Sequence, residues 1–525
     1  MIEVSDAWKD IHQRLILPEG HIEIKCEVTE FGVQDVAVPS GTNEAVFSNV
    51  SRVVDTEEFS PPPKYATCEL NMWSLDGTMS VFPDSAPYEV EGYVSNISET
   101  GSVTLRLPEV RTVAIPGITI TWSDLYGEYP PVFTVTAKNG DTVVAELTVT
   151  DNTEKVSAVD LEIANYDSVT ITVHNWCLPY RRARIERIFL GHTLLLNKND
   201  ILNFTHEQHG DVLSAEIPKN SIEFSLNNID GRWNPSNPSG LERYLSERQR
   251  LTVRYGFTMD DDSIEWIKAG TFYLSEWYAP SNGIEARFTA RDALEYIVSE
   301  ENKTTKTDTL ENLAKWATVS VPAGTEVEID ASLANYTANY KGDATSGVVL
   351  QKCANASMCV ILYDRNGALH VKPLGTEPSG YMIPLSLSYS YPEIELSKPL
   401  KAVAVHFPGG TDGYDFMFPA SSTGEVQTVN NDFIYTYAQA EQVAEWIKET
   451  LETRKKIKGE FRADPRLDLF DIVFVETKYG GMVGVVITNI KYTFNGTFSG
   501  SYEGRVVDGI TPVLGSFILD VSRLM

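Results

Sequence analysis

The sequence is poor in cysteine and has no long apolar run. Its five cysteines form no Cys-x-x-Cys pair, and their odd number gives no disulfide framework, so we expect small buried thiols in a protein made in a reducing cytosol. Residues 1–15 are polar and charged, unlike the apolar core of a signal peptide. No stretch approaches the roughly 18 apolar residues of a membrane helix. We therefore expect a cytosolic product without membrane insertion.

Catalytic signatures are also missing. The chain has no Gly-x-Ser-x-Gly elbow, no Walker loop, no Rossmann glycine fingerprint and no His-Glu-x-x-His motif. A glycosidase needs only two carboxylates, and 73 acidic residues offer too many candidates to single out a pair. We predict a protein that is not an enzyme and has no catalytic residue, metal or cofactor, and we keep a hydrolase of cell-wall glycan as an alternative.

Positive charge is scarce as well. Lys and Arg total 43 against 73 Asp and Glu, which gives a net charge of -30. Nucleic acids attract clustered Lys and Arg, so this balance argues against specific or general nucleic-acid binding. The acidic residues are spread along the chain, which is typical of a soluble surface.

The residues that are present favour strands. A chain of 525 residues is too long for one core and predicts several domains. Short alternating runs recur, and Asn139-Gly140 lies between two of them as a hairpin signal. Helical spacing appears late, over 308–317, 346–358 and 436–455, with Asp308 and a Thr436/Gln439 pair as caps. The predicted fold class is mainly β with short helices, as several β-barrel or sandwich domains.

An internal echo divides the first half of the chain. Residues 50–83 and 200–235 share one order, a polar lead-in followed by an alternating strand that ends at Asp-Gly. Between them, residues 88–187 are rich in Val, Thr and Ile and have the length of one β-sandwich. The two ends of a sandwich can lie close together, so its insertion costs little. We predict a sandwich inserted into a duplicated framework, with chance alternation as the other explanation of the echo.

Four runs of sequence carry a resemblance. Residues 224–241 read Phe-Ser-Leu-Asn-Asn-Ile-Asp-Gly-Arg-Trp-Asn-Pro-Ser-Asn-Pro-Ser-Gly-Leu, and further runs follow at 244–256, 270–277 and 286–294. They resemble tail proteins of phages and prophages of Gram-positive gut bacteria. The resemblance implies a structural subunit that packs against its neighbours in a ring.

The second half is similar to the hub family of contractile and flexible phage tails. Residues 462–473 read Arg-Ala-Asp-Pro-Arg-Leu-Asp-Leu-Phe-Asp-Ile-Val. In that family the stretch often reads Asp-Pro-x-Leu-x-Leu-Gly-Asp, so here Phe470 stands in place of glycine. The resemblance implies a hub, with trimers expected, and paired closing strands over 485–492 and 494–505. An acidic lumen that keeps DNA from sticking is a further hypothesis.

The end of the insert, residues 173–188, is similar to the closing strands of galactose-binding-like jelly-roll sandwiches, which occur in carbohydrate-binding and in purely structural proteins. Sugars stack on aromatic faces and donate hydrogen bonds to carboxylates, and the loop 122–131 supplies both groups. The predicted glycan site is Trp122, Asp124, Tyr126, Glu128 and Tyr129. The alternative is that the aromatic side chains pack the end of the sandwich or a seam between domains.

Three other polar groups have a structural interpretation that we favour. Four arginines near Tyr180 could hold a phosphate-like ligand, but pairing with framework carboxylates is favoured: Arg181, Arg182, Arg184 and Arg187. His206 and His209 have metal-like spacing but lie in a segment that we interpret as a polar linker. Residues 260–262 are three aspartates that lack the calcium-loop pattern and predict a hairpin tip.

The predicted domains are an N-terminal hub-like segment (1–87), the galactose-binding-like sandwich (88–187), a hub-like domain that continues the first segment (188–300), a small α/β domain (301–375) and a C-terminal β domain with one helix (376–525). We expect a structural subunit of a tail baseplate or tail tip, assembled in the host cytoplasm and located in the virion. Its expected partners are copies of itself and the tail tube, distal-tail, tip or fibre subunits. The second hypothesis is a receptor-recognition protein that binds host cell-surface glycan through the sandwich.

Overall fold

Strands dominate the structure. The computed structural model describes residues 1–507, apart from 15, 17, 56–64, 68, 71, 73–78, 82–89, 281–282, 299, 323–324, 409–414 and 420–422. Within these ranges the helices are short, and the longest, α5 (Tyr437–Glu452), has 16 residues. The predicted fold class, mainly β with short helices in several domains, is confirmed.

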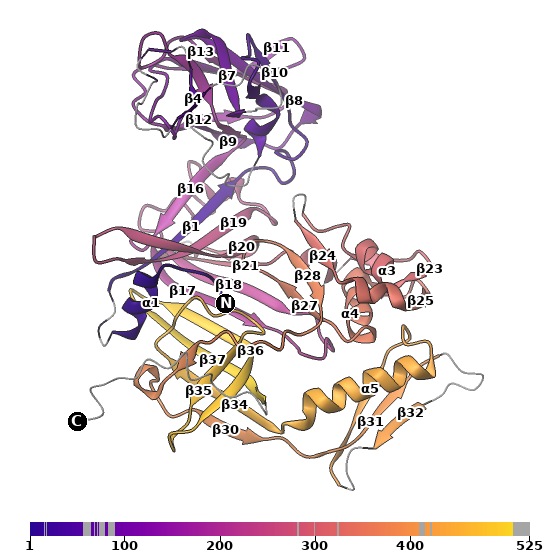
Figure 1. Ribbon diagram of the computed structural model, residues 1–525. Coiled ribbons are helices and arrows are strands. Elements are labelled where there is room, and N and C mark those ends of the chain that lie inside the picture. Colours follow the sequence, from indigo (N-terminus) through magenta and orange to yellow (C-terminus); the bar gives the residue numbers. More distant parts are fainter. Residues whose placement is uncertain are drawn as a thin grey trace.

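One 13-stranded sheet forms the body of the molecule (Figure 1). Its strands follow in the order β16 (His192–Asn197), β1 (Gly20–Val28), β19 (Arg250–Thr258), β20 (Ile264–Tyr278), β21 (Glu285–Arg291), β18 (Lys219–Asn227), β17 (Ile201–His209), β36 (Met482–Phe494), β37 (Phe498–Val507), β34 (Lys455–Phe461) and β30 (Glu393–Leu396). Beside this path, β35 (Ile472–Glu476) pairs with β36, and β29 (Met382–Ile383) pairs with β35.

Along these strands, successive side chains point to opposite faces of the sheet, and those on one face form the core. Side chains of one face, such as Ile24, Val253 and Ile487, are fully buried in a single cluster that spans the sheet from β1 to β37. The N-terminal helix α1 (Asp6–Gln13) adds Trp8 to this cluster and packs its indole edge-on against the ring of Phe257. Strands from both ends of the chain therefore share one core.

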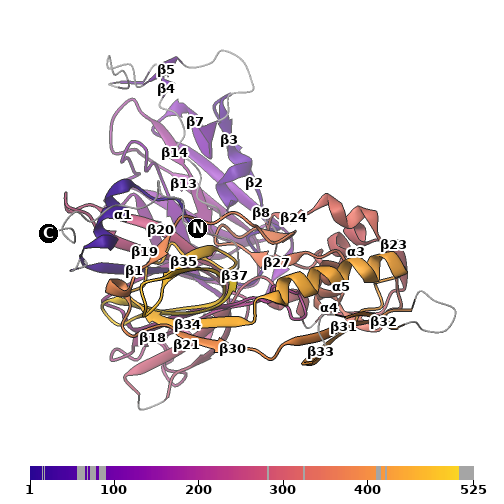
Figure 2. The ribbon, with the colours of Figure 1, turned by 60° about the horizontal axis from the view of Figure 1, so that its bottom comes forward.

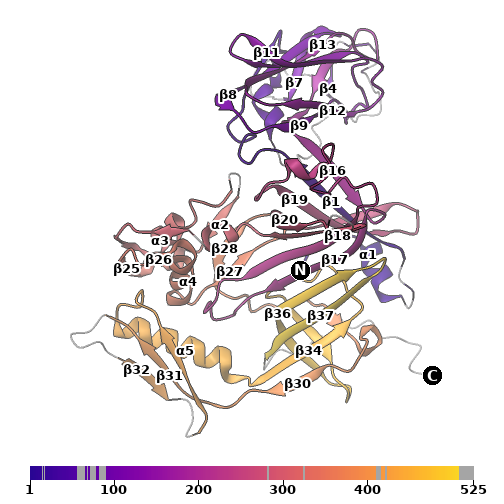
Figure 3. The same ribbon diagram turned by 180° about the vertical axis from the view of Figure 1, so that it is seen from behind.

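A β-sandwich stands on this body and is joined to it at two neighbouring strands. β1 ends at Val28 and β16 begins at His192, and these two residues are paired in the sheet. Between them, the sandwich has a five-stranded sheet of β11 (Thr142–Val149), β10 (Phe133–Asn139), β13 (Tyr166–Val173), β8 (Gly101–Arg111) and β2 (Val38–Thr42). The facing sheet is β12 (Val156–Ile163), β9 (Ile115–Thr121) and β15 (Arg187–Phe189), and the two share one core (Figures 1 and 3).

Short strand pairs complete this part of the chain. They are β7 (Tyr93–Ser98) with β14 (Arg182–Ile185), β3 (Ser48–Asn49) with β6 (Val90–Glu91), and β4 (Tyr65–Ala66) with β5 (Ser80–Val81), and η1 (Val50–Val54) is a short 3-10 helix.

The sandwich is larger than its expected range of 88–187. Val33, Ala37 and Val53 are buried in its core, and β2 extends its five-stranded sheet. Residues 1–87 therefore do not form one segment of the body: α1 and β1 belong to it, whereas β2 and the buried Val33, Ala37 and Val53 belong to the sandwich. The expected start at residue 88 is wrong: a change in composition does not show which sheet a short strand joins.

Besides the large sheet and the sandwich, a third part of the structure contains most of the described helices. Its first part contains α2 (Glu295–Val298), α3 (Leu310–Ala317), α4 (Ser346–Ala356), the 3-10 helix η3 (Ala331–Asn335), and the strands β22 (Glu301–Asn302), β23 (Lys306–Thr309), β24 (Val327–Ile329), β25 (Thr337–Tyr340), β26 (Ala344–Thr345), β27 (Val360–Tyr363) and β28 (Leu369–Lys372). Its second part contains α5 with β31 (Leu400–His406), β32 (Asp415–Pro419) and β33 (Glu425–Asn430) (Figure 2).

These two parts share one core, in which Leu350 of α4, Val403 of β31 and Ile447 of α5 are fully buried. The boundary expected at residue 376 is therefore wrong. Within 376–525, β31–β33 and α5 pack with the small α/β part, whereas β34, β36 and β37 complete the large sheet.

The predicted helices form where local signals place them. Thr436 caps α5 by accepting a hydrogen bond from the Gln439 amide at 3.1 Å. The cap of α3 is Thr309 and not Asp308, and Lys455 begins β34 instead of ending α5. The hairpin at Asn139-Gly140 joins β10 to β11 as predicted. Of the echo, the second copy contains β18, and most of the first copy lies outside the described residues.

Candidate functional site

The predicted glycan loop lies at the end of the sandwich, but its central aromatic side chain is buried. Trp122 has no exposed surface, donates a hydrogen bond from its indole nitrogen to Ser157 Oγ at 2.7 Å, and packs edge-on against Phe133. An indole inside the core has no free face for a sugar ring. The expected role of Trp122 in binding is therefore wrong, and the packing alternative describes it.

Glu128 is buried as well, inside a network of charges. It accepts a hydrogen bond from the Trp176 indole at 2.7 Å and lies 3.3 Å from the Arg181 guanidinium. Beside it, Arg184 makes two hydrogen bonds to Glu69, at 3.0 and 2.5 Å. Burial opposes the ionisation of Glu69, but these bonds from Arg184 lower the pKa of its carboxyl. Arg181 and Arg184 pair with carboxylates, as favoured, but these carboxylates belong to the sandwich part of the chain and not to the framework.

The other three predicted residues lie nearer the surface. Asp124 is exposed and forms an ion pair with Lys155 at 2.8 Å, and Tyr126 lies under the Arg184 guanidinium, 4.9 Å from its ring centroid. Tyr129 is half-buried against the sandwich core. The structure thus brings the five residues into one region, but two of them stabilise the fold from inside and do not face solvent.

His206 and His209 lie on the strand β17, so the expected polar linker is wrong. His206 is fully buried between Tyr255, whose hydroxyl is 2.7 Å from its Nδ1, and Asn220, whose Oδ1 is 2.8 Å from its Nε2. Burial and the nearby Arg365 lower the pKa of His206 to about 3, so the ring is neutral. Within the described part of the chain, no group of three or more His, Cys, Asp or Glu is arranged to hold a metal ion.

Asp260 and its neighbours form the predicted hairpin tip between β19 and β20. Arg14 of the segment after α1 binds the Asp260 carboxylate through two hydrogen bonds of 2.7 Å on the surface. None of the described helices is long and apolar enough to cross a membrane.

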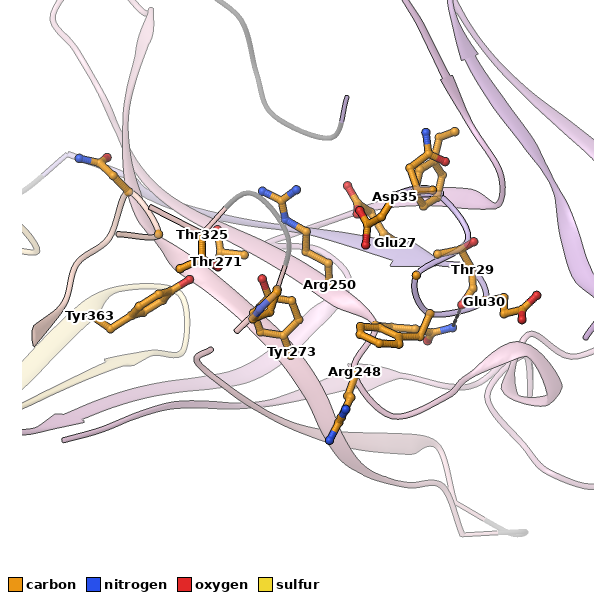
Figure 4. A pocket seen from close by; sticks show the side chains of 18 residues that line it. Glu27, Thr29, Glu30, Asp35, Arg248, Arg250, Thr271, Tyr273, Thr325 and Tyr363 are labelled. Atoms are coloured by element: carbon orange, nitrogen blue, oxygen red, sulfur yellow. Dashed lines mark hydrogen bonds between the residues drawn. The ribbon is translucent and has the colours of Figure 1, made fainter. Parts of the chain in front are cut away.

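A cavity of about 110 Å³ lies where the sandwich, the large sheet and the small α/β part meet (Figure 4). We call it the junction cavity. The end of β1 and the segment after it supply Glu27 and Asp35, β19 supplies Arg250, β20 supplies Tyr273, and β27 supplies Tyr363. In Figure 4 the Arg250 side chain stands between the tyrosine rings and the two carboxylates.

The charges of the junction cavity are partly withdrawn from water. Burial raises the pKa of Asp35, and the charge of Arg250 opposes this shift. Burial also raises the pKa of Tyr273 to about 12, so its hydroxyl remains a hydrogen-bond donor. Gln249, which also lines the cavity, donates hydrogen bonds to the carbonyls of Thr29 and Tyr244, at 2.8 and 2.7 Å. The Gln249 side chain therefore links the base of the sandwich to the body beside the junction cavity.

A second contact between the same parts lies on the surface. Glu162 of β12 accepts a hydrogen bond from the Tyr244 hydroxyl at 2.7 Å and pairs with Arg243 at 3.0 Å. Both partners belong to the short 3-10 helix η2 (Glu242–Tyr244) of the body. The two strand connections and this surface contact are thus joined by further contacts between the same parts, such as His192 Nε2 of β16, which lies 3.1 Å from Asp160 of β12.

The segment 464–471, which carries the hub-like motif, is a second junction. Arg365, from the turn between β27 and β28, donates hydrogen bonds to the carbonyls of Pro465 and Leu467, and its Nε lies 3.5 Å from Asp468. The Tyr492 hydroxyl of β36 donates to the Leu467 carbonyl at 2.8 Å. One buried arginine therefore fastens the small α/β part to the large sheet.

The motif's departure from the family pattern has a structural counterpart. Phe470 has φ +63, a left-handed conformation that favours glycine. Its ring lies over Gly210, where an added Cβ would come within 2.6 Å of the Phe470 ring. The bulky residue is accommodated because the position it faces has no side chain.

Comparison with known proteins finds similarity in structure but none in sequence. No family model and no curated protein matches the sequence. The structure is similar to the tail protein from Neisseria meningitidis MC58, with 11% identity and a TM-score of 0.46, over 61% of this chain and 96% of that one. It is similar to the prophage MuSo2 43 kDa tail protein from Shewanella oneidensis, with 13% identity and a TM-score of 0.42, over 61% and 95%. It is also similar to the prophage tail protein gp18 from Listeria monocytogenes EGD-e, with 11% identity and a TM-score of 0.40, over 64% and 96%.

Sequence reasoning missed both junctions. Arg365 lies in the turn between β27 and β28, and a charged residue in a turn is ordinarily exposed. Only 3% of the Arg365 side chain is exposed, because the segment 464–471 packs over it. This segment lies about a hundred residues later in the chain, so the local sequence gives no sign of the burial. The one sequence signal for this junction was the hub-like motif itself, because its Pro465 and Leu467 carbonyls accept the hydrogen bonds of Arg365.

Proposed function

We propose that the chain is a structural subunit of a phage or phage-derived tail, in the baseplate or tail tip. One observation carries this proposal: the runs that resemble tail proteins, at 224–241, 244–256, 270–277 and 286–294, contribute to four neighbouring strands of one sheet, β19, β20, β21 and β18. The resemblance is thus gathered in one continuous framework. A rigid framework of this kind suits a protein whose role is to hold neighbours in place and not to catalyse a reaction.

The proposed assembly is a ring or hub between the tail tube and the host-attachment parts, with trimers expected. The two end strands of the large sheet support it. β16 exposes Leu195, which is 59% exposed, and β30 exposes Ile394 and Leu396, at 44% and 67%. End strands also present unpaired backbone groups, so apolar end strands favour contact with another chain.

The sandwich is proposed to project from this ring. Its two connections to the body are adjacent, so it extends to one side of the large sheet (Figure 3). This placement suits contact with fibre or tip subunits or with the cell surface. The proposal includes no defined glycan site, because Trp122 and Glu128 are buried.

The assembly is tested by size-exclusion chromatography with light scattering on the purified full chain. We expect a trimer, and we expect the double variant Ile394→Lys/Leu396→Lys to lower its stability because two charges would be buried at the contact. The matched control is Val143→Lys/Leu147→Lys on the sandwich strand β11, where the side chains are 49% and 37% exposed, and it should leave the oligomer unchanged. The tail assignment is tested by immunogold electron microscopy of induced particles. Particles without label, together with a chain that stays monomeric at all concentrations, would refute the proposal.

A further inference from the structure

Several polar atoms of the junction cavity have no partner in the described fold. Gln249 is 1% exposed, and its Oε1 accepts no hydrogen bond from the described residues, although its amide nitrogen donates two. Tyr363 is 4% exposed, and neither its hydroxyl nor that of Tyr273 forms a hydrogen bond with a described residue. Buried polar groups are ordinarily hydrogen-bonded, because burial removes their hydration. These three atoms can therefore bind a molecule that enters the cavity.

Two opposite charges of the cavity also lack a direct partner. In the described part of the chain, no residue forms an ion pair or a side-chain hydrogen bond with Arg250, whose Nε is buried. The Asp35 carboxylate is likewise unpaired among the described residues. Figure 4 shows Arg250 between the two tyrosine rings and Asp35. The other charged side chains that line the cavity have contacts within the fold: Glu27 with Lys25, Glu30 with Arg111, and Arg248 with the ring of Tyr296.

These groups together favour a neutral ligand with several hydroxyl groups. An anion would be attracted by Arg250 and repelled by Asp35, and a cation would meet the reverse. A hydroxyl group suits both charges, because it accepts a hydrogen bond from Arg250 or a tyrosine and donates one to Asp35 or to Gln249 Oε1. Phe31 and Phe189 also line the cavity, and aromatic faces pack against the C–H faces of sugar rings. A sugar therefore matches the cavity better than an ion does.

The volume of the cavity suits one sugar ring. A cavity needs about 10–15 Å³ to hold one water molecule, so the junction cavity, with about 110 Å³, holds several. A ring with its hydroxyl groups replaces these waters and can satisfy the same polar atoms. A longer saccharide would have to extend out of the cavity.

We propose that the junction cavity binds a sugar ring, at a site separate from the predicted loop 122–131. Its polar groups come from three parts of the fold: Asp35 from the base of the sandwich, Arg250 and Tyr273 from the large sheet, and Tyr363 from the small α/β part. A bound ring therefore bridges these parts and fixes their arrangement. The inference does not depend on the proposed tail role, since it rests on groups within one chain.

The test is saturation-transfer difference NMR on the purified full chain. The probes are glucose, galactose and N-acetylglucosamine, with glycine as a zwitterion and inorganic phosphate as an anion for comparison. We expect saturation transfer to at least one sugar. Transfer to none of the sugars would overturn the proposal, and transfer to glycine or phosphate as well would overturn the argument from charge.

The double variant Tyr273→Phe/Tyr363→Phe locates the sugar, because it removes two hydroxyl donors and leaves the rings in place. It should weaken binding of the responding sugar by about tenfold, since each hydrogen bond contributes severalfold. The matched control is Tyr278→Phe on the same strand β20, where the side chain is 65% exposed and lies outside the cavity lining. The control should change binding less than about twofold. Equal effects of the two variants would place the sugar elsewhere and overturn the proposal.

Urea unfolding separates an effect on binding from an effect on folding. Because neither hydroxyl has a partner among the described residues, the double variant should keep the urea midpoint of the unsubstituted chain. A lower midpoint together with the loss of binding would show that these hydroxyl groups hold the fold, and would overturn their role as ligand donors.

Hydrogen exchange followed by mass spectrometry tests whether the sugar bridges the three parts. At saturating sugar, protection should rise in 27–35, 249–250, 271–273 and 360–367 and should stay unchanged in 122–131. A rise confined to 122–131 would assign the sugar to the loop of the sandwich and overturn the proposal.

Discussion

Arg365 offers a sharp test of how the parts of this protein are held together. Only 3% of its side chain is exposed, and that of its ion-pair partner Asp468 is 14% exposed. The guanidinium donates to the Pro465 and Leu467 carbonyls and lies beside the Asp468 carboxylate. The substitution Arg365→Met keeps much of the volume but removes every donor. Two backbone carbonyls and one half-buried carboxylate then lose a partner.

The expected cost follows from these contacts. Hydrogen bonds to charged groups contribute about 1.5–3 kcal/mol each, and breaking a buried ion pair by removing one partner costs about 3–5 kcal/mol. The contributions overlap, so we expect Arg365→Met to lower the free energy of unfolding by about 3–5 kcal/mol. The matched control is Arg14→Met, since Arg14 and Asp260 make two hydrogen bonds of 2.7 Å while their side chains are 47% and 75% exposed. Water and salt screen that surface pair, so its loss should have little effect.

Hydrogen exchange followed by mass spectrometry measures both variants. For Arg365→Met, protection should fall in 360–372 and 464–471, and the urea midpoint of the transition that includes these segments should fall as well. For Arg14→Met, both readouts should match the unsubstituted chain. A loss below about 1 kcal/mol for Arg365→Met, or equal losses for the two variants, would refute the reasoning from burial.

Four further predictions concern other buried positions. His206 has a pKa of about 3 in the fold against an ordinary 6.5, so only the unfolded chain gains this proton between those values; stability should fall as pH drops through this range, and His206→Gln should remove that part of the slope in urea titrations. Burial raises the pKa of Asp292 to about 8 from an ordinary 3.8, so the fold keeps a proton that the unfolded chain releases; Asp292→Asn should gain stability relative to the unsubstituted chain as pH rises from 4 to 8. Gly210→Ala should cost about 1–3 kcal/mol through its contact with Phe470, and a double-mutant cycle with Phe470→Gly should recover most of it; simple additivity would contradict the contact. Trp122→Ala should lower the stability of the sandwich by about 3–5 kcal/mol in thermal unfolding, and glycan binding lost without a change in stability would restore its ligand role.

Features with local causes were predictable from the sequence. α5 begins where Thr436 can cap it, and its buried residues Ala440, Val443 and Ile447 follow the helical spacing. The hairpin at Asn139-Gly140 is set by two residues that tolerate positive φ, and Gly140 has φ +56. In each case the residues that decide the structure are neighbours in the chain.

The extent of the sandwich was not predictable from the sequence. Its Val-, Thr- and Ile-rich strands alternate visibly, whereas β2 contains Pro39 and Gly41 and carries no such pattern. This strand joins the sheet by pairing with β8, about 60 residues later. The same holds for the C-terminal part, where β34 and α5 are neighbours in sequence but pack into different cores.

Thus the sequence by itself determined the mainly β class and the helices, because these depend on short-range periodicity and turn chemistry. Only the tertiary structure decided which polar and aromatic side chains are exposed to solvent and could therefore contact a ligand. The sequence predicted Trp122 and Glu128 as part of a surface site, and no local pattern marks Arg365 as buried. Their burial depends on partners far away in the chain, as does the pairing of Arg184 with Glu69, 115 residues apart. Whether a charge is solvated or paired is set by which distant segments the fold brings against it, and no local pattern records that choice.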